Sequence, residues 1–196
     1  AYLIPTLIPG LGFAVNLYIA ITGAAVLSSS VILHELAHSI MAIRYGIKVR
    51  QIVLFIFGGV SDIEEEPKDF QKEFKIAIVG PLTSFVLAGI FSLFGFIIEN
   101  IFGNSISTAW QAIDVVLYYG AMANIMLGAF NLIPAFPLDG GRILRATLVK
   151  RKGDFEAATR SVIRISILIS YVLMGFGFLG IISRTFIGGL WILLIG

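Results

Sequence analysis

Cysteine is absent from this 196-residue sequence, and histidine occurs only twice. Without cysteine there are no disulfides or thiolate metal sites, so a bound metal would need histidine, aspartate or glutamate as its ligands. Charge is also scarce, because 13% of the residues are charged and 58% are hydrophobic, whereas about a quarter of a soluble domain is charged. This composition predicts a protein of the lipid bilayer. The net charge of +2, without a long basic run, argues against a nucleic-acid partner.

Long apolar runs are what the sequence has instead, and a spanning helix needs about 20 residues. Four runs are long enough to span or nearly so, and a fifth, shorter run ends the sequence: Leu11–Ile43, Phe74–Ile98, Val115–Ile133, Ile163–Ile182 and Phe186–Ile195. Between them, three polar segments read as loops: Ser61–Gln71, Glu99–Ile113 and Lys150–Glu156. The sequence therefore predicts an all-α polytopic membrane protein, a transmembrane helix bundle.

Two short segments depart from this pattern. Gln51–Val60 is apolar and β-branched but too short to span, which predicts a strand or a re-entrant hairpin. It could offer a strand edge to an unwound peptide or be a purely structural hairpin, and both interpretations stay open. Asn131–Gly141 contains two prolines and two glycines, which cannot continue a regular helix. We therefore expect a short re-entrant β segment and a Pro-broken helix, with Arg142–Leu148 resuming the helix.

The basic residues are unevenly distributed between the loops. Arg44–Lys75 holds six and Arg142–Arg164 seven of the fourteen Lys and Arg residues, whereas Glu99–Ile113 holds none. Short cytoplasmic loops carry an excess of Lys and Arg, so both basic segments are expected to face the cytoplasm. This predicts a multi-pass protein of the cell membrane, with Trp110 as an anchor at the opposite interface.

Both histidines fall in one motif, His34-Glu35-Leu36-Ala37-His38, inside the first apolar run. Residues i and i+4 share a helix face, so the two imidazoles can bind one Zn²⁺ while Glu35 reaches a neighbouring water. A chance match is the alternative, but ionisable residues within a span are costly and usually functional. His34 precedes Arg44 by ten residues, about 15 Å along a helix. The site is therefore expected inside the bilayer, toward the cytoplasmic side.

A catalytic zinc ion normally has three protein ligands, and only carboxylates remain for the third. Six acidic residues between Asp62 and Glu73 read as a solvated loop, and Glu99 and Asp114 fall at the far interface. Asp139 instead follows the proline-broken segment, and irregular backbone at membrane depth is tolerated only where it lines a cavity or is buried in protein. Asp139 is therefore the predicted third ligand, with an ordinary Asp-Gly turn as the alternative.

Four motifs together resemble the site-2 protease family of intramembrane zinc metalloproteases. They occur in the family order: His34–His38, Phe57-Gly58-Gly59, Gly80-Pro81-Leu82-Thr83-Ser84, and Asn131 to Gly141 with Pro134, Pro137, Leu138 and Asp139. The resemblance implies one Zn²⁺ per chain, held by His34, His38 and Asp139, with Glu35 as the general base. It also implies an upstream transmembrane helix and a fuller last helix, so residues 1–196 are expected to be a single transmembrane metalloprotease core, truncated at both ends. No PDZ or CBS domain is expected in this chain.

The implied reaction is hydrolysis of peptide bonds within transmembrane segments of membrane-protein substrates, as in regulated intramembrane proteolysis. Glu35 would take a proton from water and pass it to the leaving amine. Asn131 is a candidate hydrogen-bond donor to the developing oxyanion, with capping of the broken helix as the equal alternative. Asn124 is expected to serve helix packing.

Three other functions remain as alternatives. A metal transporter also places ionisable residues at mid-membrane, but usually on several helices and with internal repeats, and no repeat is visible. A non-cleaving relative that only binds helices would have no need of Glu35 between the two histidines. A prenyl-protein type of membrane metalloprotease shares the first motif but does not need the Asn131–Gly141 pattern.

Overall fold

The structure is a computed structural model, and it describes residues 12–55, 58–63, 69–102, 108–182 and 186–196. Its elements follow in the order α2 (Phe13–Arg44), β1 (Val49–Phe55), β2 (Gly58–Ile63), α3 (Phe70–Phe102), α4 (Thr108–Asn131), α5 (Asp139–Lys152), α6 (Phe155–Ile182) and α7 (Phe186–Ile195). The chain divides into two compact units: Ala1–Glu65 with Val79–Phe130, and Glu66–Ile78 with Asn131–Gly196. The helix α3 contributes to both.

Four helices of the described residues are long and apolar enough to cross a membrane, namely α2, α3, α4 and α6. Their outward surfaces keep large apolar side chains exposed, such as Leu93 and Phe96 on α3 and Leu168 on α6. A helix that is apolar on its outer face suits lipid as its surroundings. The expected helical membrane fold is confirmed.

Several helices extend beyond the apolar runs that predicted them. Asp69 accepts a hydrogen bond from the backbone N–H of Gln71 through its Oδ1 (2.8 Å), and α3 begins directly after it. Asp154 does the same for Ala157 (3.0 Å) at the start of α6. The ends predicted for these two loops were wrong, because hydropathy detects apolar runs but not the side-chain caps that begin a helix.

The other loop boundaries shift in the same direction. The helix α3 continues to Phe102 and α4 begins at Thr108, so helix covers most of Glu99–Ile113. The helix α5 begins at Asp139, three residues earlier than expected, and ends at Lys152, which is followed by Gly153 with a left-handed φ of 70°. Glycine takes up this conformation without steric penalty, which makes it a common residue just past a helix. Between α5 and α6 only Gly153 and Asp154 remain outside a helix.

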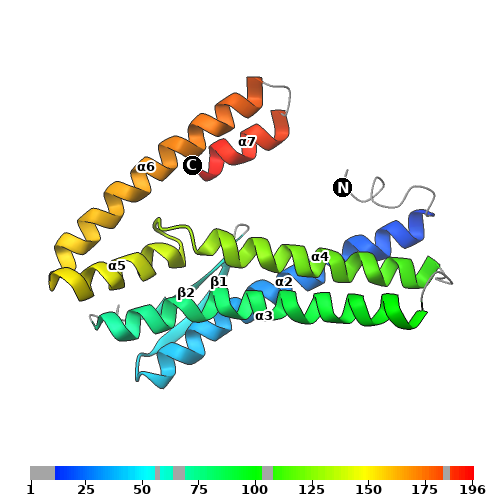
Figure 1. Ribbon diagram of the computed structural model, residues 1–196, viewed down its shortest axis with the longest axis horizontal. Coiled ribbons are helices and arrows are strands. Elements are labelled where there is room, and N and C mark those ends of the chain that lie inside the picture. Colours follow the sequence, from blue (N-terminus) through cyan, green and yellow to red (C-terminus); the bar gives the residue numbers. More distant parts are fainter. Residues whose placement is uncertain (1–11, 56–57, 64–68, 103–107, 183–185) are drawn as a thin grey trace. The chain divides into compact units, whose positions relative to one another are not determined.

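In the first unit α2, α3 and α4 run alongside one another (Figure 1). Ile19 on α2 packs in a buried apolar cluster with Ala112 and Val116 on α4. Deeper along the same pair of helices, Asn124 donates a hydrogen bond from Nδ2 to the Oγ of Ser30 (2.9 Å). The expected packing role of Asn124 is confirmed, because its amide joins α4 to α2.

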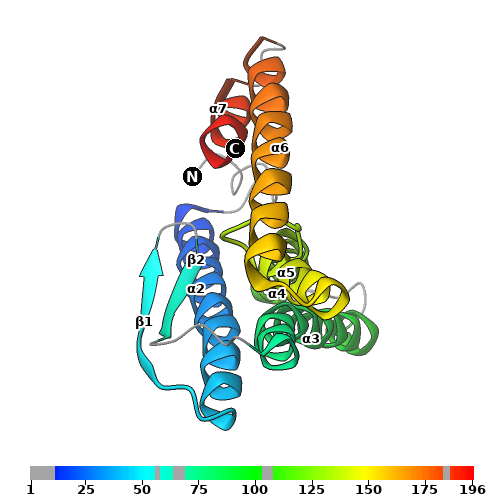
Figure 2. The same ribbon diagram turned by 90° about the vertical axis from the view of Figure 1, so that its left-hand side faces the viewer.

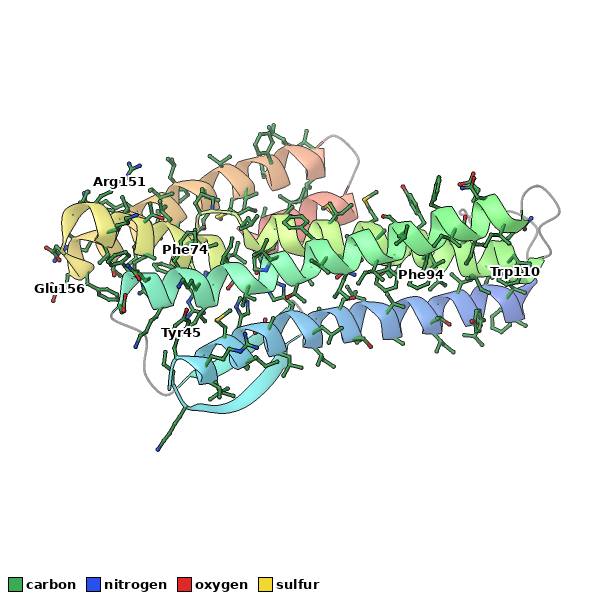
Figure 3. All side chains as sticks on the ribbon, turned by 60° about the horizontal axis from the view of Figure 1, so that its bottom comes forward. Tyr45, Phe74, Phe94, Trp110, Arg151 and Glu156 are labelled. Carbon is green, nitrogen blue, oxygen red and sulfur yellow. The ribbon has the colours of Figure 1, made fainter. Side chains whose placement is uncertain are left out.

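The strands β1 and β2 form an antiparallel hairpin, in which Val53 pairs with Val60 and Phe55 with Gly58. Both strands lie beside α2 (Figure 2). Aromatic residues mark the two ends of this unit, with Tyr45 after the last turn of α2 and Trp110 in the first turn of α4 (Figure 3). Aromatic side chains are common at both interfaces of a membrane.

In the second unit α7 folds back beside α6 (Figure 1). Glycines make this close approach possible. A Cβ added at Gly177 would lie 2.5 Å from the backbone nitrogen of Leu193, and one added at Gly189 would lie 2.5 Å from that of Ile181. Small residues let helix backbones meet in this way in membranes.

We predict that Gly177→Ala separates α7 from α6. The new methyl group would overlap the backbone of α7, which cannot move aside as a side chain can, and such overpacking costs about 1–3 kcal/mol. The apparent melting temperature of the detergent-purified chain should fall by several degrees.

Gly175→Ala is the matched control, because a Cβ at Gly175 would meet nothing within 4 Å. Gly175 lies on the same helix, two residues away, so the helix-propensity gain is the same in both variants. Equal melting temperatures for the two variants would contradict the packing of α7 on α6.

Candidate metal centre

The helix α2 carries His34, Glu35 and His38, and all three side chains are buried. The two imidazole rings lie with their centroids 4.9 Å apart and their planes at 74°. Their proximity follows from the i, i+4 spacing, which brings the two side chains to one face of the helix. The first unit therefore holds two buried, adjacent nitrogen donors of the kind that a zinc ion binds.

A residue of α3 orients the first of these rings. The Oγ of Ser84, which is fully buried, lies 2.9 Å from Nδ1 of His34. A histidine that binds a metal through one nitrogen commonly donates a hydrogen bond with the other, which fixes its tautomer and orientation. With Nδ1 facing Ser84, Nε2 is the nitrogen through which His34 would bind a metal.

Gly80, one turn earlier on α3, makes room for both rings. A Cβ at this position would lie 2.2 Å from Nε2 of His38 and 2.7 Å from Nε2 of His34. The backbone of α3 thus approaches the Nε2 atoms of the two imidazoles as closely as glycine allows. The sequence placed Gly80 and Ser84 in a family motif but assigned them no part in the site. Their i, i+4 spacing, which mirrors that of the histidines, was the available signal.

The second unit holds Asp139 and Asn131, at the two ends of an irregular segment. Asn131 is the last residue of α4, and Asp139 is the buried first residue of α5. Between them, short hydrogen bonds fold the backbone on itself: Ala135 N–H to Ile133 O (2.7 Å) and Leu138 N–H to Ala135 O (2.9 Å).

The two glycines after Asp139 are required by this fold. A Cβ at Gly140 would lie 2.3 Å from the carbonyl oxygens of Leu132 and Ile133, and one at Gly141 would lie 2.7 Å from the carbonyl carbon of Ala135. Because these neighbours are backbone atoms, any side chain would displace the segment. The Asp-Gly-Gly sequence is therefore a packed junction, with Asp139 at its start.

One acidic residue is placed differently from the sequence expectation. Glu73 was assigned to a solvated loop, but it lies in the first turn of α3 with no exposed surface and forms an ion pair with Arg145. That assignment was wrong, because the Asp69 cap extends α3 by several residues. Phe57 of the second family motif and the acidic residues Glu64–Glu66 lie outside the described residues.

The donor chemistry of the chain suits zinc. Two imidazoles with one carboxylate and an open position form a common catalytic zinc set. Among the residues whose burial the structure describes, Glu35, Glu73 and Asp139 are the buried carboxylates. Glu73 is engaged by Arg145, and Glu35 points about 100° away from His34 on the same helix. The residues present thus fit the ion without a thiolate.

We predict that Gly80→Ala weakens zinc binding. The added methyl group would displace both imidazoles from their present positions, and disturbing the support of metal ligands typically lowers affinity by about 10–100-fold. The measurement is competition for zinc against a chelator of known affinity, with folding checked by circular dichroism.

Gly89→Ala serves as the control. Gly89 lies on the same helix, and a Cβ there would meet nothing within 4 Å. Zinc affinity that is unchanged in Gly80→Ala would show that the histidines do not bind the metal where α3 faces them.

Comparison with known proteins identifies relatives over most of the chain. The model of peptidase family M50 matches residues 22–115 and 96–174. Rip3 of Mycobacterium tuberculosis is 34% identical over 198 residues, covering 100% of this chain and 48% of the relative. A zinc metalloprotease of Methanocaldococcus jannaschii is 42% identical over 150 residues, covering 76% and 41%. The chain thus spans about half the length of the curated relatives it matches.

A solved structure agrees with these relatives. The site-2 protease from Methanocaldococcus jannaschii superposes with a TM-score of 0.64 at 34% sequence identity, covering 87% of this chain and 73% of that one. The family model covers well over half of the chain, and the motif carrying His34, Glu35 and His38 falls within the matched residues. The chain belongs to peptidase family M50, the family of the site-2 proteases.

Proposed function

We propose that this chain is the core of an intramembrane zinc metalloprotease that hydrolyses peptide bonds within transmembrane segments of membrane proteins. The observation that carries the proposal is the burial of His34, Glu35 and His38 on a helix long enough to span a membrane. Ionisable side chains in such a helix are costly unless they serve a function. The fit of Gly80 and Ser84 to the two rings supports metal binding as that function.

Asp139 is the proposed third ligand, so that His34, His38 and Asp139 hold one zinc ion per chain. The other two buried carboxylates are less suited to be the third ligand. Glu73 is paired with Arg145, and Glu35 is directed away from the face of α2 that carries the histidines. The backbone also supports Asp139 as the third ligand, since Gly140 and Gly141 keep the segment around it tightly folded. Residues 1–196 would then act as one catalytic core.

The proposed chemistry is metal-assisted peptide hydrolysis. When bound, zinc polarises the scissile carbonyl and makes a water more acidic. Glu35 then accepts the proton of the attacking water and delivers it to the leaving amine. Asn131 is proposed to donate a hydrogen bond to the oxyanion, because it ends α4 beside the irregular segment that leads to Asp139.

The proposed site lies in the bilayer toward the cytoplasmic side. His34 is ten residues before Arg44, the last residue of α2, which corresponds to about 15 Å along the helix. In this arrangement the β1–β2 hairpin is a re-entrant element, and the segment between α4 and α5 is a Pro-broken helix at the active site. Irregular backbone at that depth requires burial in protein or a lined cavity, and Ala135 and Asp139 in this region are buried.

We predict that Glu35→Gln keeps zinc and fold but loses cleavage. Glutamine is nearly isosteric and forms hydrogen bonds, but it cannot accept a proton at neutral pH, and loss of a general base lowers the rate by about 10²–10⁴-fold. Zinc content, melting temperature and cleavage of a model transmembrane substrate are measured on one purified preparation.

Asp139→Asn is the companion variant, and it should lower both zinc content and cleavage. Chelator treatment of the wild type should abolish cleavage as well. If Glu35→Gln cleaves at nearly the wild-type rate, the proposed mechanism is wrong. If the zinc-loaded wild type cleaves no transmembrane substrate, a transporter or a binding-only relative becomes the better description.

We also predict the sidedness of the chain. In a chain without native cysteine, Glu156→Cys should be labelled from the cytoplasmic side and Ser105→Cys from the opposite side, because basic residues surround the first position and are absent around the second. Glu156 is exposed at the start of α6 (Figure 3). Membrane-impermeant maleimide is applied to intact and to permeabilised cells.

Permeabilised cells are the control, since both positions should then be labelled. Labelling of both positions in intact cells would exclude the alternating topology. It would also remove the argument that places the site toward the cytoplasm.

A further inference from the structure

The second unit contains a buried ion pair that the proposed chemistry does not use. Arg145 on α5 donates a hydrogen bond from Nε to Oε1 of Glu73 (2.7 Å), and its Nη2 lies 2.5 Å from the same oxygen. The two side chains are 6% and 1% exposed. A guanidinium that presents two nitrogens to one carboxylate holds it in a defined direction, which a flexible ammonium does not.

Two aromatic rings enclose the same guanidinium. Its central carbon lies 5.2 Å from the ring centroid of Phe136 and 4.7 Å from that of Phe155. Cations within about 6 Å of a ring centroid are attracted to the ring face, more strongly where water is excluded. Arg145 therefore connects the start of α3, through Glu73, to Phe136 in the irregular segment.

Phe136 is three residues before Asp139 and is held a second time. Its backbone N–H donates a hydrogen bond to Oγ of Ser166 on α6 (2.8 Å), and that hydroxyl donates in turn to the carbonyl of Val162 (2.9 Å). The side chain of Phe136 is thus fixed by Arg145 and its backbone by Ser166. Both contacts act on the short, glycine-packed stretch that carries Asp139.

Stability alone is a weak explanation for this ion pair. Removing two charges from water carries a large desolvation cost, and apolar replacements of a buried pair are often neutral or stabilising. A buried pair is better suited to fixing one arrangement among alternatives, since any other arrangement leaves a charge unpaired. The arrangement fixed here is that of the segment around Phe136.

We propose that Glu73 and Arg145 are positioning residues that hold the Phe136–Asp139 segment in the geometry needed for metal binding. This inference rests on the proposed role of Asp139 as a ligand. Zinc affinity should depend on the pair even though neither residue touches the metal, and the pair should matter more for the site than for the stability of the fold.

The test is the double variant Glu73→Leu/Arg145→Met, which removes the pair without leaving a buried charge. We expect a folded protein with a melting temperature close to wild type, about 10–100-fold weaker zinc binding, and a lower kcat at an unchanged KM. A folded double variant that binds zinc as tightly as wild type overturns the proposal. Arg145→Lys is the second variant, and it should also weaken zinc binding because it keeps the charge but loses the planar fork.

The matched control is Glu156→Gln/Arg160→Gln. It removes an exposed ion pair on α6 whose atoms are 3.7 Å apart, so the change in charge is the same. Equal loss of zinc affinity in the control and in the Glu73/Arg145 variants overturns the proposal. Failure of both the double variant and Arg145→Lys to fold also overturns it, because the pair would then belong to the fold rather than to the site.

A zinc-free measurement separates this inference from the proposed function. Ala135 precedes Phe136 and is buried, and Ala135→Cys would introduce the only thiol of the chain. Its labelling should be several-fold faster in Arg145→Lys than in the wild-type background. Slow labelling in both backgrounds overturns the positioning role. If the wild type binds no zinc but labelling still depends on the Glu73–Arg145 pair, the metal site is overturned. The positioning of the Phe136–Asp139 segment by the pair then stands.

Discussion

Two imidazoles can lie within an apolar helix pair here because α3 presents almost no side chain to them. At Gly80 the nearest ring nitrogens are within 3 Å of where a Cβ would be, and Ser84 satisfies Nδ1 of His34 one turn later. Buried polar groups require hydrogen-bond partners. Ser84 can be such a partner for His34 because the backbone of α3 lies close to the two rings at Gly80. The burial of the motif on α2 thus depends on the small residues of α3.

The second unit also buries polar groups, and there a charge pair adds to the effect of small residues. Its polar groups are an acidic residue at the start of α5 and an ion pair packed between two phenylalanines. Glycine is again the residue at the closest approach, but here it faces backbone carbonyls rather than imidazoles. In both units the buried polar side chains are packed against neighbouring residues that leave them little freedom to change position.

The sequence predicted the spanning helices well and placed His34, Glu35 and His38 on one helix, because both predictions depend on local information. Apolar runs of sufficient length identify α2, α3, α4 and α6, and the His34–His38 spacing identifies one helix face. Helix ends were placed less well, since Asp69 and Asp154 act through single hydrogen bonds that hydropathy does not register. Glu73 was misplaced for the same reason. Its pairing with Arg145 spans 72 positions of the sequence, and no local pattern predicts such a contact.

The helix α3 is one continuous element that carries Glu73 near its start and Gly80 seven residues later. Seven residues correspond to nearly two full turns, so these two positions keep a fixed angular relation of about 20°. Inserting or deleting one residue between them would rotate one position against the other by about 100°. The length of this stretch is therefore constrained as well as its composition, because a change in length alters the angle between Glu73 and Gly80, whereas a substitution at a position between them leaves that angle unchanged.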